Sequence, residues 1–247
     1  RREWEEFDQR VQSVAEARLN GIADLRQYGL VQQLGGLGSI VSIYEQLTDM
    51  AGAHIDMDAL TEGRNDSAGF QPVSIPVPFI HKDFQVDIRR LQASRRTGDG
   101  LDVTNSGRAT RKVSEGLENM LFNGAELRVT VDGKPSLIYG YTTHPDRTVV
   151  DATAPWGDPQ AIHDSVNLMI QAASDNHYYG PFGLYIAQSQ FGQTRQRYTD
   201  GSGQIVRKTL REIDELTFVK GSSFLESGEA TLVCLDHDCV DIAIAQD

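Results

Sequence analysis

The chain has 247 residues, of which 39% are hydrophobic and 23% are charged, so it can bury a core without a metal ion or a disulfide framework. The mean hydropathy is −0.37 and no run of 18 or more apolar residues occurs, which argues against a transmembrane helix. The 23 basic and 35 acidic residues give a formal net charge of −12, the wrong sign for a protein whose whole surface binds nucleic acid.

The cysteines and the start of the chain bear on its cellular compartment. Only Cys234 and Cys239 are present, a number that provides no disulfide framework and is typical of a reducing compartment. The first residue is Arg1, and no basic and then apolar leader follows it. The low cysteine content argues against secretion, and the start predicts that processing or disorder has removed the true beginning.

An amphipathic helix is predicted at the beginning of the chain. Four apolar residues recur there at spacings of three, four and three, with charged and polar residues between them: Trp4, Phe7, Val11 and Val14. This spacing places the four side chains on one face of a helix. No neighbouring segment provides a matching apolar face, so the helix needs a partner surface.

Extended structure and loops are predicted over the next part of the chain. Gly35, Gly36 and Gly38 precede the apolar run at 39–43, which indicates a turn that leads into a short strand. Residues 56–71 are polar and rich in turn formers, as in a mobile loop or a hairpin tip. Residues 72–88 then alternate apolar and polar positions, which predicts two extended segments on either side of 79–82, at a sheet edge because of their prolines.

Two helices with clear start and stop signals follow. Asn105 or Ser106 can cap a helix that ends at Asn123-Gly124. Its predicted apolar face consists of Ala109, Val113, Leu117, Met120 and Leu121. Asp158-Pro159 opens the second helix, whose apolar stripe continues to Ala173.

Short strands are predicted between and after these helices, so the class is α+β. Asp132-Gly133 is a turn that favours a hairpin between 127–131 and 137–139. The remaining predictions are strands at 184–187, 216–219, 231–235 and 240–245 and a short helix at 205–213.

No catalytic, cofactor or metal site is predicted. Cys234, His237 and Cys239 lie within six residues, but a closed zinc site needs four ligands and no second Cys/His pair is nearby. We interpret 236–238 instead as the tip of a hairpin between two strands, with a cysteine at each end. The chain has no phosphate-binding loop, dinucleotide fingerprint or nucleophile elbow, so it is not predicted to be an enzyme.

Basic residues gather in one part of the sequence: Arg89, Arg90, Arg95, Arg96, Arg108, Arg111 and Lys112. One interpretation is contact with phosphates or with an acidic neighbouring subunit. The other is a solvated face that balances the acidic surplus, which the net charge favours over nucleic-acid binding. The net charge does not exclude pairing of these basic residues with acidic residues of a neighbouring subunit.

Taken together, these segments resemble the Hong Kong 97 shell-protein fold, shared by the major capsid proteins of tailed phages and by encapsulin nanocompartments. The resemblance covers nearly the whole chain. The segments that carry it are the N-terminal helix at 4–14, the extended run at 75–87 with Leu91, the spine-like helix at 109–115 with Glu118, Phe122 and Gly124, the short strand at 138–140, the helix at 162–173 and the strand at 179–186.

The resemblance implies a division of the chain into four parts. These are an N-terminal arm at 1–50, an extended loop at 51–82 that lies over an adjacent subunit, a peripheral domain with the long spine helix at 83–134, and an axial domain at 135–247 that gathers at five-fold and six-fold positions. A final C-terminal strand segment of the family is expected to be missing.

The resemblance also implies a function. We expect a phage major capsid protein that assembles, as pentamers and hexamers, into an icosahedral head around double-stranded DNA in the virion, after assembly in the bacterial host cytoplasm. DNA would be enclosed without sequence-specific binding, and scaffolding, portal or decoration proteins are further partners; no cofactor and no membrane are expected. The candidate interface residues are Trp4, Phe7, Val11, Val14, Arg64, Phe70, Lys82, Arg89 and Arg90.

Two alternatives remain. One is an encapsulin shell that holds a cargo enzyme, with a peptide-docking groove formed in part by the N-terminal helix. The other, of a different class, is an α+β enzyme or binding domain whose site is not local in sequence, for example around His237 and the two cysteines.

Overall fold

The computed structural model describes residues 20–48, 50, 52, 55, 57, 67–85, 87–97, 104–131, 134–152, 154–199 and 203–245. The chain folds as two units, one formed by Arg1–Gln32 and Phe79–Ile242 and the other by Gln33–Pro78 and Ala243–Asp247. The N-terminal helix predicted at 4–14 lies outside the described residues.

The longest helix of the first unit, α4 (Thr104–Asn123), confirms the predicted spine-like helix. Its fully buried positions are Ser106, Ala109, Ser114, Glu118 and Phe122. The predicted apolar face is thus offset, because Val113, Leu117, Met120 and Leu121 are only half-buried beside this stripe. Small serine and alanine side chains let other elements approach the helix closely, and α2 (Asn20–Gln27) packs there.

The C-terminal end of α4 is closed by a loop from farther along the chain. Gly124 adopts a left-handed backbone conformation, with φ of +73°, which ends the helix as expected for a glycine at this position. The backbone N–H groups of Tyr141 and Thr142 donate to the carbonyls of Leu121 and Phe122 at 3.0 and 2.9 Å. These bonds satisfy helix carbonyls that would otherwise lack partners.

An antiparallel hairpin connects α4 to this loop. It consists of β4 (Ala125–Val131) and β5 (Lys134–Ile138), with a register shift between Leu127 and Thr130. The two predicted strands are confirmed, while the Asp132-Gly133 turn between them lies outside the described residues.

A three-stranded sheet forms the centre of the first unit. The middle strand is β6 (Phe182–Ala187), which pairs parallel with β7 (Leu216–Ser222) and antiparallel with β8 (Ala230–Cys234). All six residues of β6 are buried, because side chains alternate between the two faces of a strand and both faces are covered.

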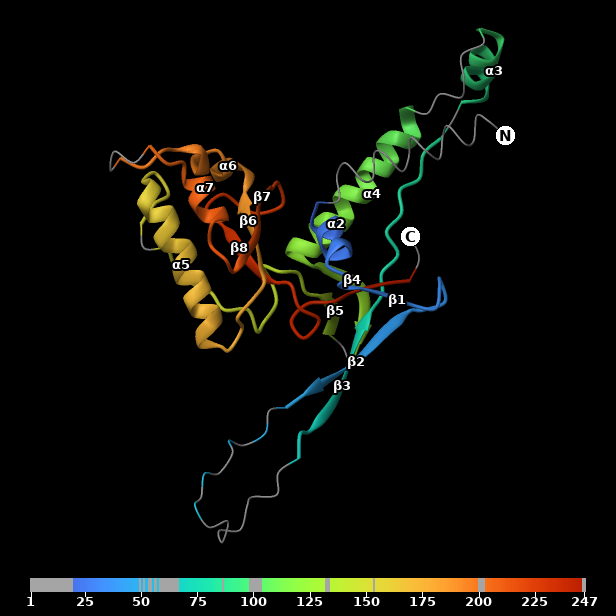
Figure 1. Cartoon of the computed structure of the whole chain (residues 1–247). Helices are drawn as coiled ribbons and strands as arrows, with labels where there is room; N and C mark the ends of the chain where they lie inside the picture. Colours follow the sequence, from blue (N-terminus) through green and yellow to red (C-terminus); the bar gives the residue numbers. More distant parts are fainter. Residues whose placement is uncertain are drawn as a thin grey trace. The chain divides into compact units, whose positions relative to one another are not determined.

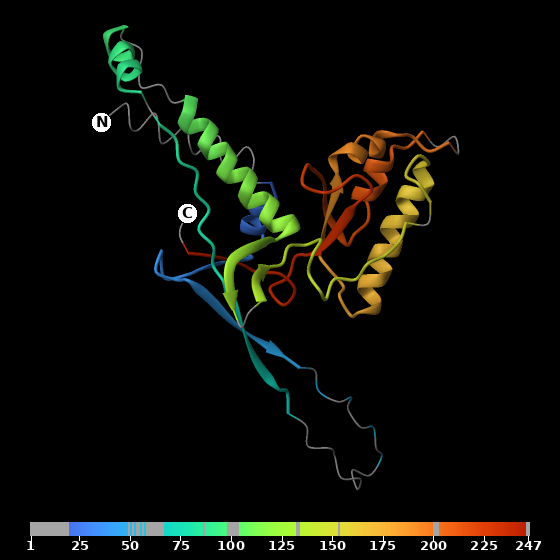
Figure 2. The same cartoon turned by 180° about the vertical axis from the view of Figure 1, so that it is seen from behind.

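Different helices cover the two faces of this sheet (Figures 1 and 2). On one face, Phe182, Leu184 and Ile186 pack with α5 (Pro159–Asp175) and α7 (Val206–Arg211). On the other, Tyr185 and Ala187 pack in a cluster with residues of α2 and α4. The predicted start of α5 is confirmed, since the Asp158 side chain accepts a hydrogen bond from the Gln160 N–H at 3.2 Å. The short helix α6 (Gln188–Phe191) and a 3-10 turn (Gln193–Arg195) follow β6.

The segment between β8 and the last strand corrects one prediction. We predicted a hairpin with its tip at 236–238, but β9 (Ile242–Ile244) pairs with β1 (Val31–Gln33) and not with β8. The Ile242 N–H donates to the Leu30 carbonyl at 3.1 Å, and the Leu34 N–H donates to the Ile244 carbonyl at 2.8 Å. Pairing between segments about 200 residues apart leaves no local sequence signal.

A helix replaces part of the second extended segment predicted from the sequence. Residues Ile88–Thr97 form α3, so the extended prediction was wrong at Ile88, where apolar and polar alternation was too short to separate strand from helix. The Asp87 side chain accepts a hydrogen bond from the Arg89 N–H at 2.9 Å, which is how a side chain at a helix start satisfies a free backbone donor.

The second unit is built around one hairpin, β2 (Val41–Leu47) and β3 (Phe70–Pro76). The two strands pair antiparallel from Val41↔Pro76 to Leu47↔Phe70 without a register shift. The Val77 N–H donates to the Ile40 carbonyl at 2.8 Å and the Thr48 N–H to the Gly69 carbonyl at 3.0 Å, which extends the pairing by one residue at each end.

Candidate assembly surface

The β2–β3 hairpin presents apolar side chains to solvent on one face. Directly opposite residues of an antiparallel pair share a face, so the register places Val41, Ile43, Leu47 and Phe70 together. All four are exposed, with Ile43 at 71% and Phe70 at 66% of full accessibility. We call these four residues the hairpin surface. Glu45 lies between Ile43 and Leu47 on this face, so the four apolar residues form two neighbouring exposed groups, which are typical of a site that another surface covers.

The opposite face of the hairpin is apolar too. Tyr44 lies opposite Val73, and Ile75 lies opposite Ser42 on the same face. Tyr44 and Ile75 are exposed and Val73 is half-buried. A two-stranded ribbon is marginally stable by itself in water, so a ribbon that is apolar on both faces requires contacts beyond its own pairing.

The predicted interface residues are placed as follows. Phe70 belongs to the hairpin surface. Lys82 is exposed in the irregular segment after β3, and Arg89 is exposed on α3. Arg90 lies on α3, but its side chain is outside the described part, as are Trp4, Phe7, Val11, Val14 and Arg64 altogether. No pair of these predicted residues is brought into contact within the described part.

Sequence reasoning missed the β2 half of the hairpin surface. Only the run at 39–43 was recognised as extended, and none of the candidate interface residues came from β2. Val41, Ile43 and Leu47 lie at even spacings, which is the strand signal. That signal was present in the sequence. However, only the tertiary structure decides which apolar faces of the strands stay exposed.

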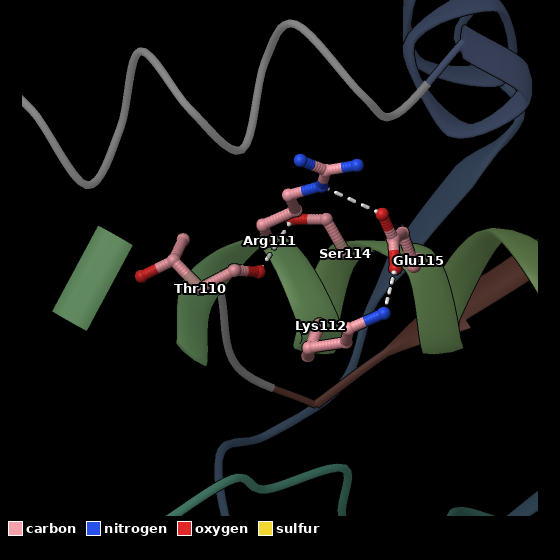
Figure 3. Close-up of polar contacts among 5 residues, drawn as sticks. All are labelled: Thr110, Arg111, Lys112, Ser114 and Glu115. Carbon is pink, nitrogen blue, oxygen red and sulfur yellow. Dashed lines mark hydrogen bonds and ion pairs between the residues drawn. The ribbon is translucent and has the colours of Figure 1, made fainter. Parts of the chain in front are cut away.

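Part of the predicted basic cluster is neutralised locally on α4 (Figure 3). Arg111 Nε and Lys112 Nζ lie 2.8 and 2.7 Å from the two carboxylate oxygens of Glu115. Hydrogen bonds from Lys112 and then Arg111 lower the pKa of Glu115 to about 2. Ser114 Oγ donates to the Thr110 carbonyl at 3.0 Å in the same turn. Two of the seven cations are therefore paired with a carboxylate, which weakens the interpretation of the whole cluster as a phosphate-binding surface.

Replacing Glu115 by glutamine is expected to have a small effect. Ion pairs at i,i+3 and i,i+4 spacing on an exposed helix face contribute about 0.3–0.5 kcal/mol each, so Glu115→Gln should lower the free energy of unfolding by less than about 1 kcal/mol. Urea denaturation at low and high salt measures this effect, which should shrink at high salt. A loss of several kcal/mol would mean that Glu115 holds more than these two partners.

The segment around the two cysteines offers no metal centre. Cys234 and Cys239 are free thiols, and burial beside Cys234 raises the pKa of Cys239 to about 12. His237 Nδ1 lies 2.9 Å from Asp241 Oδ1. Across the described ranges, no group of three or more His, Cys, Asp or Glu side chains is placed to hold a metal ion. Likewise, none of the helices in those ranges is long and apolar enough to cross a membrane.

Comparison with known proteins identifies relatives along the whole chain. The Type 1 encapsulin shell protein EncA of Myxococcus xanthus (strain DK1622) is 23% identical over 248 residues, which covers 99% of this chain and 80% of that protein. Among solved structures, a virus-like particle from Pyrococcus furiosus matches with a TM-score of 0.60 and 16% identity, over 97% of this chain and 84% of that one.

A phage capsid structure gives a second structural match. The capsid of Myoviridae phage XM1 matches with a TM-score of 0.52 and 14% identity, over 80% of this chain and 68% of that one. The predicted α+β fold of the Hong Kong 97 type is thereby confirmed. A family model described as "Family of unknown function (DUF6260)" matches residues 1–247. The chain therefore belongs to this family of unknown function, and its fold is that of the Hong Kong 97-type shell proteins of encapsulins and tailed phages.

Proposed function

We propose that this chain is the structural subunit of a closed icosahedral shell, built by contacts between many copies of itself and without catalysis. The observation that carries the proposal is the match of 97% of the chain to the fold of a virus-like particle protein. A closed shell multiplies weak contacts, because each subunit is held by several neighbours at once.

The β2–β3 hairpin supports a role in contacts between copies. Its hairpin surface and its opposite face are both apolar and exposed in the single chain, and burying such side chains against a neighbour is favourable by about 25 cal/mol per Å² of apolar area. We propose that residues 51–82, which include β3, form the extended loop that lies over an adjacent subunit, and that β2, at the end of the N-terminal part, pairs with it. For the rest of the chain we propose an N-terminal arm at 1–50, a peripheral domain at 83–134 and an axial domain at 135–247.

For the contents of the shell, we propose double-stranded DNA, which would make the chain the major capsid protein of a virion assembled in a host cytoplasm. The capsid of phage XM1 has the same fold. A net charge of −12 suits a container that encloses DNA without gripping it, because the container repels the packed phosphates. We propose that the shell is built from pentamers and hexamers of this chain. Scaffolding, portal or decoration proteins are the proposed further partners.

The second candidate is an encapsulin shell around a cargo protein. One specific observation favours it: the curated relative that matches 99% of this chain is an encapsulin shell protein. Both candidates rest on contacts between copies of this chain, and the contents of the interior distinguish them.

Electron microscopy of the purified full-length protein tests the shell, and its absorbance tests the contents. We expect uniform polyhedral particles by negative stain. After nuclease treatment of the outside, a nucleic-acid spectrum at 260 and 280 nm supports a DNA container, and a protein spectrum with a co-purifying second polypeptide supports the cargo container. Small oligomers alone, under conditions that favour assembly, would refute the shell.

The N-terminal arm provides a further prediction. If Phe7 and Val11 pack on a neighbour, Phe7→Asp/Val11→Asp places two charges in an apolar contact, and the desolvation of each costs several kcal/mol. We expect particle yield by sucrose-gradient sedimentation to fall at least tenfold. Glu6→Asp with Gln9→Asn, polar changes in the same segment, provides the control and should leave the yield unchanged. Normal yield from the double aspartate variant would exclude the arm from the interface.

A further inference from the structure

A group of ionisable side chains, buried except for a partly exposed lysine, lies between α2, α4 and the central sheet, and the proposed assembly does not use it. It consists of Asp24 of α2, Glu118 of α4, Tyr185 of β6 and Lys220 of β7. Asp24 and Glu118 are each only 2% exposed. We call these four residues the carboxylate cluster. Two buried carboxylates in one place are costly unless each has partners.

Asp24 has a partner for each oxygen. Tyr185 donates its hydroxyl to Asp24 Oδ2 at 2.8 Å, and Lys220 Nζ forms an ion pair with Asp24 Oδ1. The positive charge of Lys220 thus balances the negative charge of Asp24. Through these two contacts, Asp24 connects helix α2 to strands β6 and β7 of the sheet.

Glu118 has a partner for one oxygen only. The Gly21 N–H of α2 donates to Glu118 Oε1 at 2.6 Å, and a Cβ at Gly21 would lie 2.7 Å from Leu121 Cδ2, so α2 approaches α4 as closely as a glycine allows. Glu118 Oε2 is buried and has no hydrogen-bond partner within the described part of the chain. An ionised carboxylate with one oxygen buried and unsatisfied carries a large desolvation cost, which a proton removes.

The charges around Glu118 also favour its uncharged form. The groups that face it are Asp24 from α2, Lys220 from β7, Tyr185 from β6 and Tyr141 from the loop after β5. Burial and then the charge of Asp24 raise the pKa of Glu118 from 4.5 to about 7, against the lowering effect of the Gly21 and Ile22 N–H groups and of Lys220. Burial raises the pKa of Tyr141 and Tyr185 far above neutrality, so both tyrosines stay neutral, and the cluster has zero net charge only when Glu118 holds a proton.

We propose that Glu118 is a proton-dependent latch that holds α2 against α4 and releases it more often as the carboxyl loses its proton on approach to neutral pH. The carboxyl binds its proton more tightly in the docked form than in the opened form. Docking is therefore strongest below about pH 4.5, and it weakens as the pH rises through about 7. From pH 6 to pH 8, the opening equilibrium of α2 should increase about tenfold. The latch acts on α2 within a single subunit and independently of assembly.

Hydrogen exchange of the intact protein tests the latch. Protection factors are measured by mass spectrometry at pH 6, 7 and 8, corrected for the intrinsic exchange rate, in a peptide over Asn20–Gln27 and in a reference peptide from α5. We expect the protection of α2 to fall about tenfold from pH 6 to pH 8 while that of α5 stays constant. A constant protection of α2, or an equal fall in α5, would overturn the proposal.

Two variants test whether the pH dependence of α2 protection comes from Glu118 or from another ionisable group. Glu118→Gln keeps an oxygen for the Gly21 N–H but cannot ionise, so its α2 protection should change less than twofold over the same pH range. The matched control is Glu115→Gln, one turn earlier on α4 and outside the cluster, which should keep the tenfold change. The same fall in Glu118→Gln as in the natural protein would refute the latch.

A further variant keeps the proposal testable if Glu118→Gln does not fold. Asp24→Asn removes the negative charge beside Glu118 and leaves Lys220 without its counter-charge, so the carboxyl of Glu118 ionises at lower pH. The pH at which α2 protection falls should then move downward. An unmoved midpoint in Asp24→Asn would contradict the assignment of the titration to Glu118.

Discussion

The double substitution Ile43→Asp/Phe70→Asp is expected to abolish particle formation and to leave the subunit folded. Both side chains belong to the hairpin surface and are about two-thirds exposed in the single chain. A substitution at such a site changes the stability of the subunit by about 0.5 kcal/mol or less. In a shell the same side chains would be buried against a neighbour, where two unpaired carboxylates cost several kcal/mol per contact. That cost recurs at every subunit, so assembly fails as a whole.

The measurement is particle yield by sedimentation and electron microscopy, together with circular dichroism of the unassembled subunit. Gln46→Asp/Gln71→Asp is the matched control, because these exposed residues are the polar pair at one end of the hairpin and add the same charge without removing an apolar side chain. We expect the control to assemble. Normal yield from Ile43→Asp/Phe70→Asp would remove the hairpin surface from the interface, and equal failure of both variants would assign the effect to charge rather than to apolar burial.

Gly140→Ala is expected to lower the free energy of unfolding by about 3 kcal/mol or more. A Cβ at Gly140 would lie 2.4 Å from the Gly124 nitrogen and 2.5 Å from the Phe122 carbonyl oxygen. These are backbone atoms, which cannot rotate away, so the loop must withdraw from the end of α4. Withdrawal breaks the bonds that Tyr141 and Thr142 donate to the helix carbonyls, and each buried carbonyl left unsatisfied costs about 1–3 kcal/mol.

Denaturation by urea, or the soluble yield if the variant does not fold, measures this effect. Gly107→Ala is the control, since Gly107 lies within α4 and a Cβ there meets no atom within 4 Å. Alanine is favoured over glycine inside a helix by about 0.5–1 kcal/mol, so the control should be slightly more stable than the natural protein. A Gly140→Ala variant as stable as the natural protein would show that the loop can move without cost.

The elements that local sequence predicted correctly carry their own start, stop and spacing signals. The helix α5 begins at Pro159 because Asp158 caps it, and α4 ends where Gly124 turns left-handed. The strand β6 was recognisable from its apolar run, and its complete burial explains why that run is uninterrupted. These signals involve residues a few positions apart, so one sequence is enough to detect them.

The errors occurred where the local pattern was ambiguous or where distant segments decide the outcome. The helix α3 was missed because a short alternation at 84–88 does not separate helix from strand. The predicted hairpin around Cys234 and Cys239 failed because β9 pairs with β1 instead of β8. The buried face of α4 was offset because α2 packs against Glu118, Leu121 and Phe122. Glu118 recurs at a spacing of four with Ser114 and Phe122, and that spacing was the only local signal for its burial.

By itself, the sequence determined the α+β class, the positions of its well-capped helices and the resemblance to shell proteins, because periodicity, capping and composition are local properties of the chain. The tertiary structure decided which apolar faces stay uncovered, as on Ile43 and Phe70, and which carboxylates become buried, as at Asp24 and Glu118. Burial depends on what packs against a residue from far along the chain. The exposed hairpin surface and the carboxylate cluster therefore became visible only once the elements were brought together.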